Sequence, residues 1–292
     1  MIFQAGQRTR WWNLATFVFA WIVALVAVGG SVYREHIPPD SWLYWLSWHQ
    51  PLYVGMSMPY APPVALLFAP AALMPLRAFE IFWQAVLLAA AAWLMSPLPV
   101  RLRIPYFVAL AGTTMSGNIA ILLAVPLALA PRYPALWGFV AWVKLTPEVA
   151  ALYLLRQRSW RAAAVAVAPA AALGVLMLLF QFDLMSRWVA FLRSIESLAG
   201  SVMPGIIGWS LPVTYRLPFA ALVAWWGRGR GWTIAVAATI GMPDINLATL
   251  ALLGAIPRLE AYTGPGATTR VVDSAAARAD SPVPSVTVAS TD

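Results

Sequence analysis

The chain contains no cysteine, a single lysine and few charged residues of any kind. The absence of cysteine from its 292 residues excludes disulfides, thiolate metal sites and cysteine nucleophiles. Two histidines, His36 and His49, are too few to form a metal cluster by themselves. Charged residues make up 10% of the chain, against 61% apolar residues and a mean hydropathy of +0.74. Soluble globular proteins do not have this composition, so we expect a membrane protein.

Long apolar runs support that expectation. Residues 12–32, 81–100, 162–182 and 217–226 contain no charged side chain, and the last run is the shortest. Because a helical span needs ~20 apolar residues, residues 1–260 are predicted to form an all-α, polytopic transmembrane domain with about eight to ten crossings. Sixteen tryptophans, many near the ends of runs, suit an interfacial aromatic belt. Residues 261–292 are rich in Ser, Thr, Ala, Pro and Gly and are predicted to be a disordered tail.

The arginines predict the orientation. The net charge of +8 is spread over small clusters between apolar runs, which is the positive-inside pattern and not a basic face for nucleic acid. The clusters at positions 8/10, 101/103, 156/158/161 and 228/230 are therefore assigned to the cytoplasmic side, as is the N-terminus. An even number of crossings must separate the first two clusters. The proline-rich stretch 61–76 is then expected not to cross, so residues 33–77 form one external juxtamembrane segment.

Two later stretches are too short to cross the membrane twice. Residues 104–130 and 133–155 each lie between arginines, whereas two full crossings need ~40 residues. Each is either one long span or a hairpin whose tip stays at membrane depth, and the same choice arises for residues 232–256. Polar or helix-breaking residues at positions 116–118 and 144–148 favour hairpins with those residues at the tips.

Lys144 and Asp40 are the ionisable residues of most interest. A charge near the bilayer centre costs at least ~2.5–3.5 kcal/mol, so Lys144 needs a compensating partner. Glu148 lies four residues on and could form a helical ion pair, although Pro147 limits a regular helix. The alternative is that Lys144 binds an anion such as a lipid phosphate. Asp40 follows the first span and is either the N-cap of an aromatic helix or a general base at the membrane surface.

Several short motifs occur in an order that resembles a known family. They are Asp40-Ser-Trp-Leu-Tyr44, Tyr60-Ala-Pro-Pro63, Phe68-Ala-Pro70, Gly117-Asn118, Gly138 leading into Lys144-Leu-Thr-Pro147, and Arg158-Ser-Trp-Arg161. Their order over about residues 12–165 resembles the polyprenol-phosphate-sugar-dependent glycosyltransferases of the C-type fold, family 87. Two departures from the family pattern are Asn118 in place of a glutamine and a later Asn-Gln-Ser motif present only as Gly208-Trp-Ser210.

The resemblance implies a C-type fold and transfer of a sugar, expected to be a hexose such as mannose, from a polyprenyl-phosphate donor. The acceptor would be a lipid or glycan at the external face of the cell membrane. Asp40 would be the catalytic base, and Lys144 would contact the donor phosphate with Arg216 and Arg34 as helpers. The expected substrate-binding residues are Tyr44, Tyr60, Asn118, Glu148 and Ser210.

No cofactor or metal is expected, because we find no nucleotide site and no carboxylate cluster. Two alternatives remain open. One is a non-catalytic protein of the same fold that binds lipid-linked sugar or a partner. The other is a transporter, against which the chain lacks a detectable inverted repeat.

Overall fold

The computed structural model describes residues 14–15, 17–19, 21–22, 40–54, 58–202, 213–227, 230–242, 245–246 and 248–263, of which residues 146, 195–202 and 213 are described by their backbone alone. Every regular element in this part of the chain is a helix, which confirms the all-α prediction there. The residues described between positions 14 and 22 are helical, and the elements with defined bounds follow them. In chain order, with η marking 3-10 helices, they are α2 (Asp40–Leu46), α3 (Pro62–Leu67), η1 (Ala69–Leu73), α4 (Leu76–Met95), α5 (Val100–Thr114), α6 (Ala120–Leu129), η2 (Pro134–Leu136), α7 (Trp137–Val143), η3 (Thr146–Ala151), α8 (Leu152–Arg156), α9 (Trp160–Phe180), α10 (Phe182–Val202), α11 (Val213–Trp226), α12 (Gly231–Gly241), η4 (Thr249–Ala255) and α13 (Ile256–Thr263).

Prolines mark the beginnings of many helices. Pro62 and Pro63 form the first turn of α3, and Pro75 and Pro99 immediately precede α4 and α5. Proline suits these positions because its fixed φ matches the helix and its missing N–H would be unpaired there anyway. The proline-rich stretch 61–76 is thereby divided into α3 and η1, of six and five residues. Neither is long enough to cross a bilayer, which needs ~20 residues.

Two outer helices are long and apolar. In the described part of the chain, α4 with 20 residues and α9 with 21 are the helices whose length and composition would allow them to cross a membrane. Ala166 is the buried residue of α9, and apolar side chains such as Leu179 and Phe180 are 70% and 75% exposed. A helix that is apolar all round and uncovered by protein suits contact with lipid. The expected number of crossings stays a prediction, because most of residues 12–32 lie outside the described residues.

The inner helices are short and buried. α6 has ten residues and α12 has 11, and seven and eight of these respectively are buried. Both helices pack against η4 in the centre of the molecule. A helix of this length cannot cross a bilayer alone. Breaks between such helices are tolerated at membrane depth where protein buries them, because no backbone polar group then faces lipid.

The hairpins expected from the sequence take two forms. Between residues 104 and 130 the chain forms α5 and α6, which are separate helices joined by residues 115–119, here called the first tip. Between residues 133 and 155 the chain first forms η2 and α7. Helix α7 runs alongside α9 in the same direction, since Gly138 lies against Ala170 and the indole of Trp142 lies against Gly174. The chain breaks at Lys144 and returns through η3 and α8 to the beginning of α9. Residues 144–148 are the second tip.

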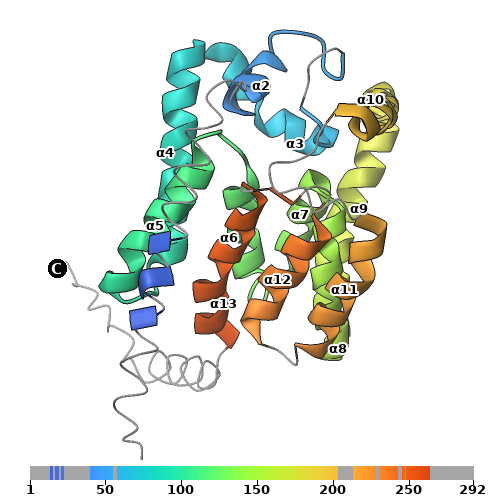
Figure 1. Cartoon of the computed structure of the whole chain (residues 1–292). Coiled ribbons are helices and arrows are strands. Elements are labelled where there is room, and N and C mark those ends of the chain that lie inside the picture. Colours follow the sequence, from blue (N-terminus) through green and yellow to red (C-terminus); the bar gives the residue numbers. More distant parts are fainter. Residues whose placement is uncertain are drawn as a thin grey trace, which may run out of the picture.

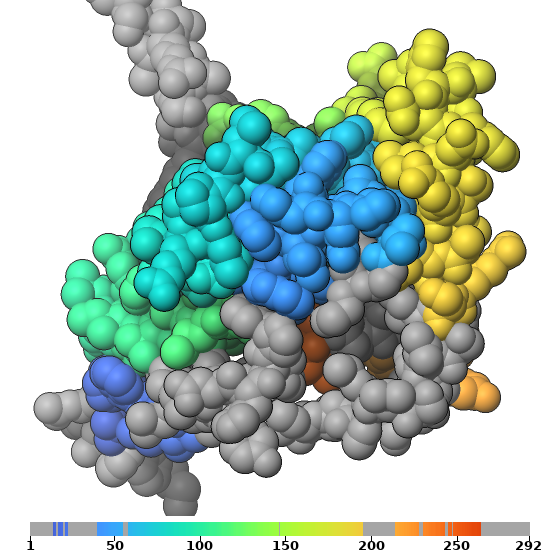
Figure 2. Space-filling view, turned by 90° about the horizontal axis from the view of Figure 1, so that it is seen from above, coloured from blue at the N-terminus to red at the C-terminus, as the bar shows by residue number. Residues whose placement is uncertain are grey.

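A layer of short helices covers one end of this bundle. Residues 40–54 and 58–73, here called the cap layer, contain α2, α3 and η1 and lie at the upper end in Figure 1. Figure 2, which looks down on this end, shows α2 and α3 in blue between α4 in teal and α10 in yellow. The indole of Trp188 on α10 donates to the Pro59 carbonyl at 3.1 Å. The indole of Trp45 on α2 donates to the Met74 carbonyl at 2.8 Å.

The opposite, lower end of Figure 1, where α8 ends and α5 and α12 begin, is here called the arginine-rich end. Arg103, near the start of α5, donates to the carbonyls of Ser96 and Leu98 at 2.8 and 2.9 Å. The guanidinium of Arg258, on α13, lies 4.1 Å from the centre of the Trp93 ring and donates to the Ser96 hydroxyl. Basic side chains from separate parts of the sequence therefore meet at one end of the molecule.

Candidate functional site

The first tip turns sharply around a glycine. Gly117 has a φ of +75°, a conformation that residues with a side chain rarely adopt. A Cβ added there would lie 2.7 to 2.9 Å from the amide and side chain of Ser41. Glycine is therefore needed both for the turn and for the close approach of α2 to the tip.

Asp40 lies against this tip at the beginning of α2. Its amide donates to the Ser116 carbonyl at 2.5 Å. Its Oδ2 accepts a hydrogen bond of 2.6 Å from Nδ2 of Asn118, and Oδ1 of Asn118 accepts one of 2.8 Å from the Ala120 amide. The second bond fixes which way the Asn118 amide points. The Asp40 carboxylate is thus joined to a residue 78 positions away, which is more than capping its own helix requires.

Tyr44 supports the tip one helical turn after Asp40. The Tyr44 side chain is 1% exposed, its hydroxyl lies 2.9 Å from that of Tyr60, and the Ile119 amide donates to it at 3.3 Å. Burial raises the pKa of the Tyr44 phenol well above its usual value, and the nearby Tyr60 and Asp40 raise it further. Tyr44 therefore stays a neutral hydroxyl at physiological pH.

Helix α4 holds the other side of the tip. The indole of Trp83 donates to the Gly117 carbonyl at 2.6 Å, and Nε2 of Gln84 donates to the Thr114 carbonyl at 2.8 Å. The Trp83 ring also packs against Tyr44 and Phe68, with ring centres 5.6 and 5.1 Å away. Sequence reasoning had not singled out Trp83 or Gln84. The one signal available was Gln84, a polar residue in an otherwise apolar stretch of α4.

The second tip does not form the ion pair that was one interpretation of its sequence. Helix α7 ends at Val143, and Lys144 is extended, with φ −150° and ψ 118°. An i, i+4 pair requires one continuous helix, so Lys144 and Glu148 do not share a helical face. Within the described residues Glu148 forms no ion pair with Lys144. The Ala141 backbone hydrogen-bonds the Glu148 carboxylate, and its buried Oε1 has no hydrogen-bond partner.

Arg216 joins α11 to the end of α12. It is 4% exposed, and its Nη1 donates to the carbonyls of Ile240 and Met242 at 3.0 and 2.8 Å. A cation is favourable at a helix C-terminus, where the last carbonyls lack intrahelical partners. Its geometry therefore gives Arg216 a clear structural role.

The structure brings together four of the expected site residues, Asp40, Tyr44, Tyr60 and Asn118. Helix α7, which ends just before the second tip, packs on α3 of the cap layer. Arg34 and Ser210 lie outside the described residues. Among the residues that the structure describes, no group of three or more His, Asp or Glu side chains could hold a metal ion.

The comparisons with known proteins decide the family. Residues 59–272 match the model of glycosyltransferase family 87, which covers more than half of the chain. The chain belongs to glycosyltransferase family 87. No curated protein and no solved structure matches it.

Membership of family 87 makes the chain a glycosyltransferase, a class of enzyme that transfers a sugar from a donor to an acceptor. The matched range includes Asn118, Lys144 and Arg216 and begins after Asp40. The role of Asp40 therefore depends on its motif and on its geometry at the first tip. A carboxylate held by an amide at a helix end can accept a proton from a hydroxyl, which is the chemistry that glycosyl transfer to an alcohol requires.

Proposed function

We propose that this family 87 glycosyltransferase transfers a hexose from a polyprenyl monophosphate carrier to a hydroxyl of a lipid or glycan acceptor. The observation that carries the proposal is the Asp40 carboxylate, held on the first tip by the amide of Asn118. Asp40 takes the proton of the acceptor hydroxyl while that oxygen attacks the anomeric carbon. The bond between the anomeric carbon and the phosphate oxygen breaks, and the polyprenyl phosphate leaves with the electron pair.

A lipid-linked donor fits the outer surface of the protein. The apolar side chains of α9 are exposed over most of its length, which favours a bilayer around it. The reacting groups of a donor with a membrane-embedded chain would then lie at the membrane surface, near the cap layer. We propose mannose as the first sugar to test.

Lys144 is the proposed contact for the donor phosphate. The indole of Trp142 contacts α9 at Gly174, which lies six residues before Phe180, the last residue of α9. At about 1.5 Å per helical residue, Lys144 therefore lies roughly 6–9 Å from the C-terminal end of α9, measured along the helix axis. Electrostatic attraction at such a partly buried site is stronger than in water. A lysine there stabilises the charge that develops on the leaving phosphate. Arg216 and Arg34 remain proposed helpers.

The surroundings of the remaining proposed site residues indicate which of them support the first tip and which contact the substrate. Tyr44 and Tyr60 are buried and hydrogen-bonded to each other, which favours support of the tip over contact with the sugar. Asn118 positions Asp40. The Oε1 atom of Glu148, which has no partner in the described structure, suits a hydrogen bond from a substrate hydroxyl. Ser210 is proposed on the family resemblance alone.

A transfer assay with purified protein in liposomes tests this function. With polyprenyl-phosphate mannose as donor, Asp40→Asn should lower turnover by about 10²–10⁴, the contribution of a general base. Asp183→Asn, which removes an exposed carboxylate on α10, is the matched control and should change little. Near-normal turnover by Asp40→Asn would exclude the mechanism. Donor binding without transfer by the unmodified protein would instead favour a non-catalytic lipid-sugar binder.

We also propose that the cap layer faces outside and that the arginine-rich end faces the cytoplasm, as the positive-inside rule predicts. Because the chain has no cysteine, single cysteines report on this directly. Arg77→Cys, at the beginning of α4, should react with a membrane-impermeant thiol reagent in intact cells. Arg101→Cys, at the beginning of α5, should react only after permeabilisation. The reverse pattern would show the opposite orientation.

A further inference from the structure

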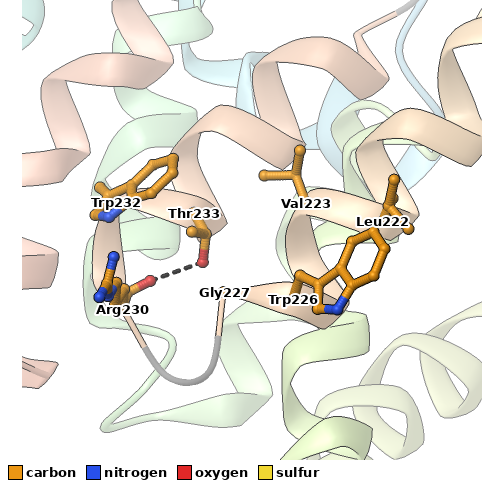
Figure 3. A pocket seen from close by; sticks show the side chains of 7 residues that line it. All are labelled: Leu222, Val223, Trp226, Gly227, Arg230, Trp232 and Thr233. Carbon is orange, nitrogen blue, oxygen red and sulfur yellow. Dashed lines mark hydrogen bonds between the residues drawn. The ribbon is translucent and has the colours of Figure 1, made fainter.

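A pocket lies between α11 and α12 at the arginine-rich end, away from the first tip. Its volume is about 590 Å³, within the range of small-ligand pockets. Figure 3 shows α11 side chains along one wall and α12 side chains along the other. The lining residues are Leu222, Val223, Trp226, Gly227, Arg230, Trp232 and Thr233.

The lining combines one cation with two indole rings. Arg230 is exposed and lies just before α12, where the Thr233 hydroxyl donates to its carbonyl at 2.7 Å and holds the local backbone. Trp226 is 66% exposed and Trp232 is 40% exposed. A guanidinium binds phosphate well, and tryptophans are enriched where a membrane meets water. The pocket therefore suits a phosphate that is attached to an apolar group.

An apolar stripe on α11 leads into the pocket. Tyr215, Phe219, Leu222 and Trp226 are all exposed and follow one another at intervals of four, three and four residues. This spacing places them on one face of the helix. The stripe ends at Trp226, on the rim of the pocket. An acyl chain lying along the stripe would put its headgroup next to Arg230.

The charges around the pocket favour an anion. The guanidinium of Arg156 lies 5.8 Å from the centre of the Trp225 ring, which adds a second cation at this end of α11. Glu260 is an acidic residue near the pocket. Its Oε1 accepts a hydrogen bond of 2.9 Å from the Trp232 amide, so this carboxylate is already engaged at the beginning of α12.

We propose that this pocket binds an anionic glycerophospholipid of the surrounding bilayer, with its phosphate at Arg230 and an acyl chain along the α11 stripe. This site is separate from the proposed donor site near the cap layer, and it does not depend on the proposed reaction. The apolar stripe is the reason for preferring a lipid over free phosphate. Basic side chains near a membrane surface attract anionic lipids by about 1 kcal/mol each, which corresponds to about fivefold in affinity.

The experiment is a lipid titration of the full-length protein in detergent, followed by native mass spectrometry. Phosphatidylglycerol and phosphatidylcholine with identical acyl chains are compared, and inorganic phosphate is added as a competitor. Phosphatidylglycerol should bind more tightly, and Arg230→Gln should weaken it by about fivefold. Arg101→Gln, which removes an exposed arginine at the same end, should not weaken it.

A second pair of variants tests the apolar part. Trp226→Ala should weaken binding of both lipids, whereas Trp160→Ala should not, although Trp160 is 68% exposed and also lies near the arginine-rich end. Equal binding of the two lipids, or equal losses in Arg230→Gln and Arg101→Gln, would overturn the proposal. So would complete displacement of the lipid by inorganic phosphate, which would show a phosphate site without a lipid-binding stripe. Should Arg230→Gln fail to fold, the lipid preference of the unmodified protein and the Trp226 pair still decide the question.

Discussion

The two tips of the inner hairpins differ in how their polar groups are used. At the first tip, hydrogen bonds from Asn118, Trp83 and Gln84 hold the turn and the Asp40 carboxylate in one arrangement. At the second tip the helix simply stops at Val143, and a buried oxygen of Glu148 has no partner in the described structure. The first tip contacts α2 of the cap layer, and α7, the helix before the second tip, packs on α3 of the same layer.

This difference agrees with two separate roles in the proposed reaction, proton transfer at the first tip and phosphate binding at the second. A general base must be held in place before the substrate arrives, because its proton transfer depends on geometry. A phosphate-binding site has to accept a large lipid-linked ligand and can form its contacts as the ligand binds. We therefore expect substitutions at the first tip to alter proton transfer, and those at the second tip to alter donor binding and departure of the phosphate.

After Asp40→Asn at the first tip, the largest effect in this comparison is expected at Lys144 in the second tip. Lys144→Ala should lower kcat/KM by about 10²–10³, the loss found when one group that stabilises developing negative charge is removed. Lys144→Arg should retain more activity, since the charge remains although a planar fork replaces the compact ammonium. Transfer assays at several donor concentrations measure both variants. Thermal unfolding should match that of the unmodified protein, and an unfolded Lys144→Ala would instead give this lysine a structural role.

A smaller effect is expected at Asn118. Asn118→Ala removes the hydrogen bond to Asp40 and should lower kcat by about tenfold, the low end of the ~1.5–3 kcal/mol that bonds to charged groups contribute. That bond stabilises the ionised carboxylate, so its loss should also move the acidic limb of the pH–rate profile to higher pH.

Asn118→Gln is the conservative control, because glutamine is the residue that the family resemblance leads one to expect at this position. It should restore part of the rate and of the profile. A lower rate with an unchanged profile would mean that Asn118 only stabilises the turn.

The sequence predicted the elements better than the contacts between them. Helix-breaking residues at positions 116–118 and Pro147 correctly indicated where the chain turns, because backbone chemistry is local. The bond between Asp40 and Asn118 joins residues 78 positions apart, and no pattern in one sequence indicates such a pairing. Trp83 looked like any other tryptophan of an apolar run, although its indole holds the first tip.

The spacing of charged residues in the sequence did not predict their contacts either. Lys144 and Glu148 have the separation of a helical pair, but that rule assumes a helix that continues past Val143. Arg216 was expected to help Lys144 bind the donor phosphate, and its guanidinium donates to the last carbonyls of α12. In both cases the partner is set by where helices end, and the ends are the part of a helix that sequence predicts least well.

The smallest effect is expected when Glu148 is neutralised in a protein that already lacks the lysine. If the two residues only neutralised each other, Lys144→Met combined with Glu148→Gln would restore the activity that Lys144→Met loses. The geometry of the second tip predicts otherwise, because Lys144 is extended and the Ala141 backbone, not Lys144, contacts the Glu148 carboxylate. Glu148→Gln keeps an oxygen that can accept a hydrogen bond from a substrate hydroxyl. It should therefore change kcat/KM by less than about threefold in either background, the low end of the ~0.5–1.5 kcal/mol that a neutral hydrogen bond contributes. The double variant should then be as impaired as Lys144→Met, with a coupling below ~0.5 kcal/mol in a double-mutant cycle. Recovery of activity in the double variant would show instead that the pair forms in the working enzyme and that the donor phosphate is bound elsewhere.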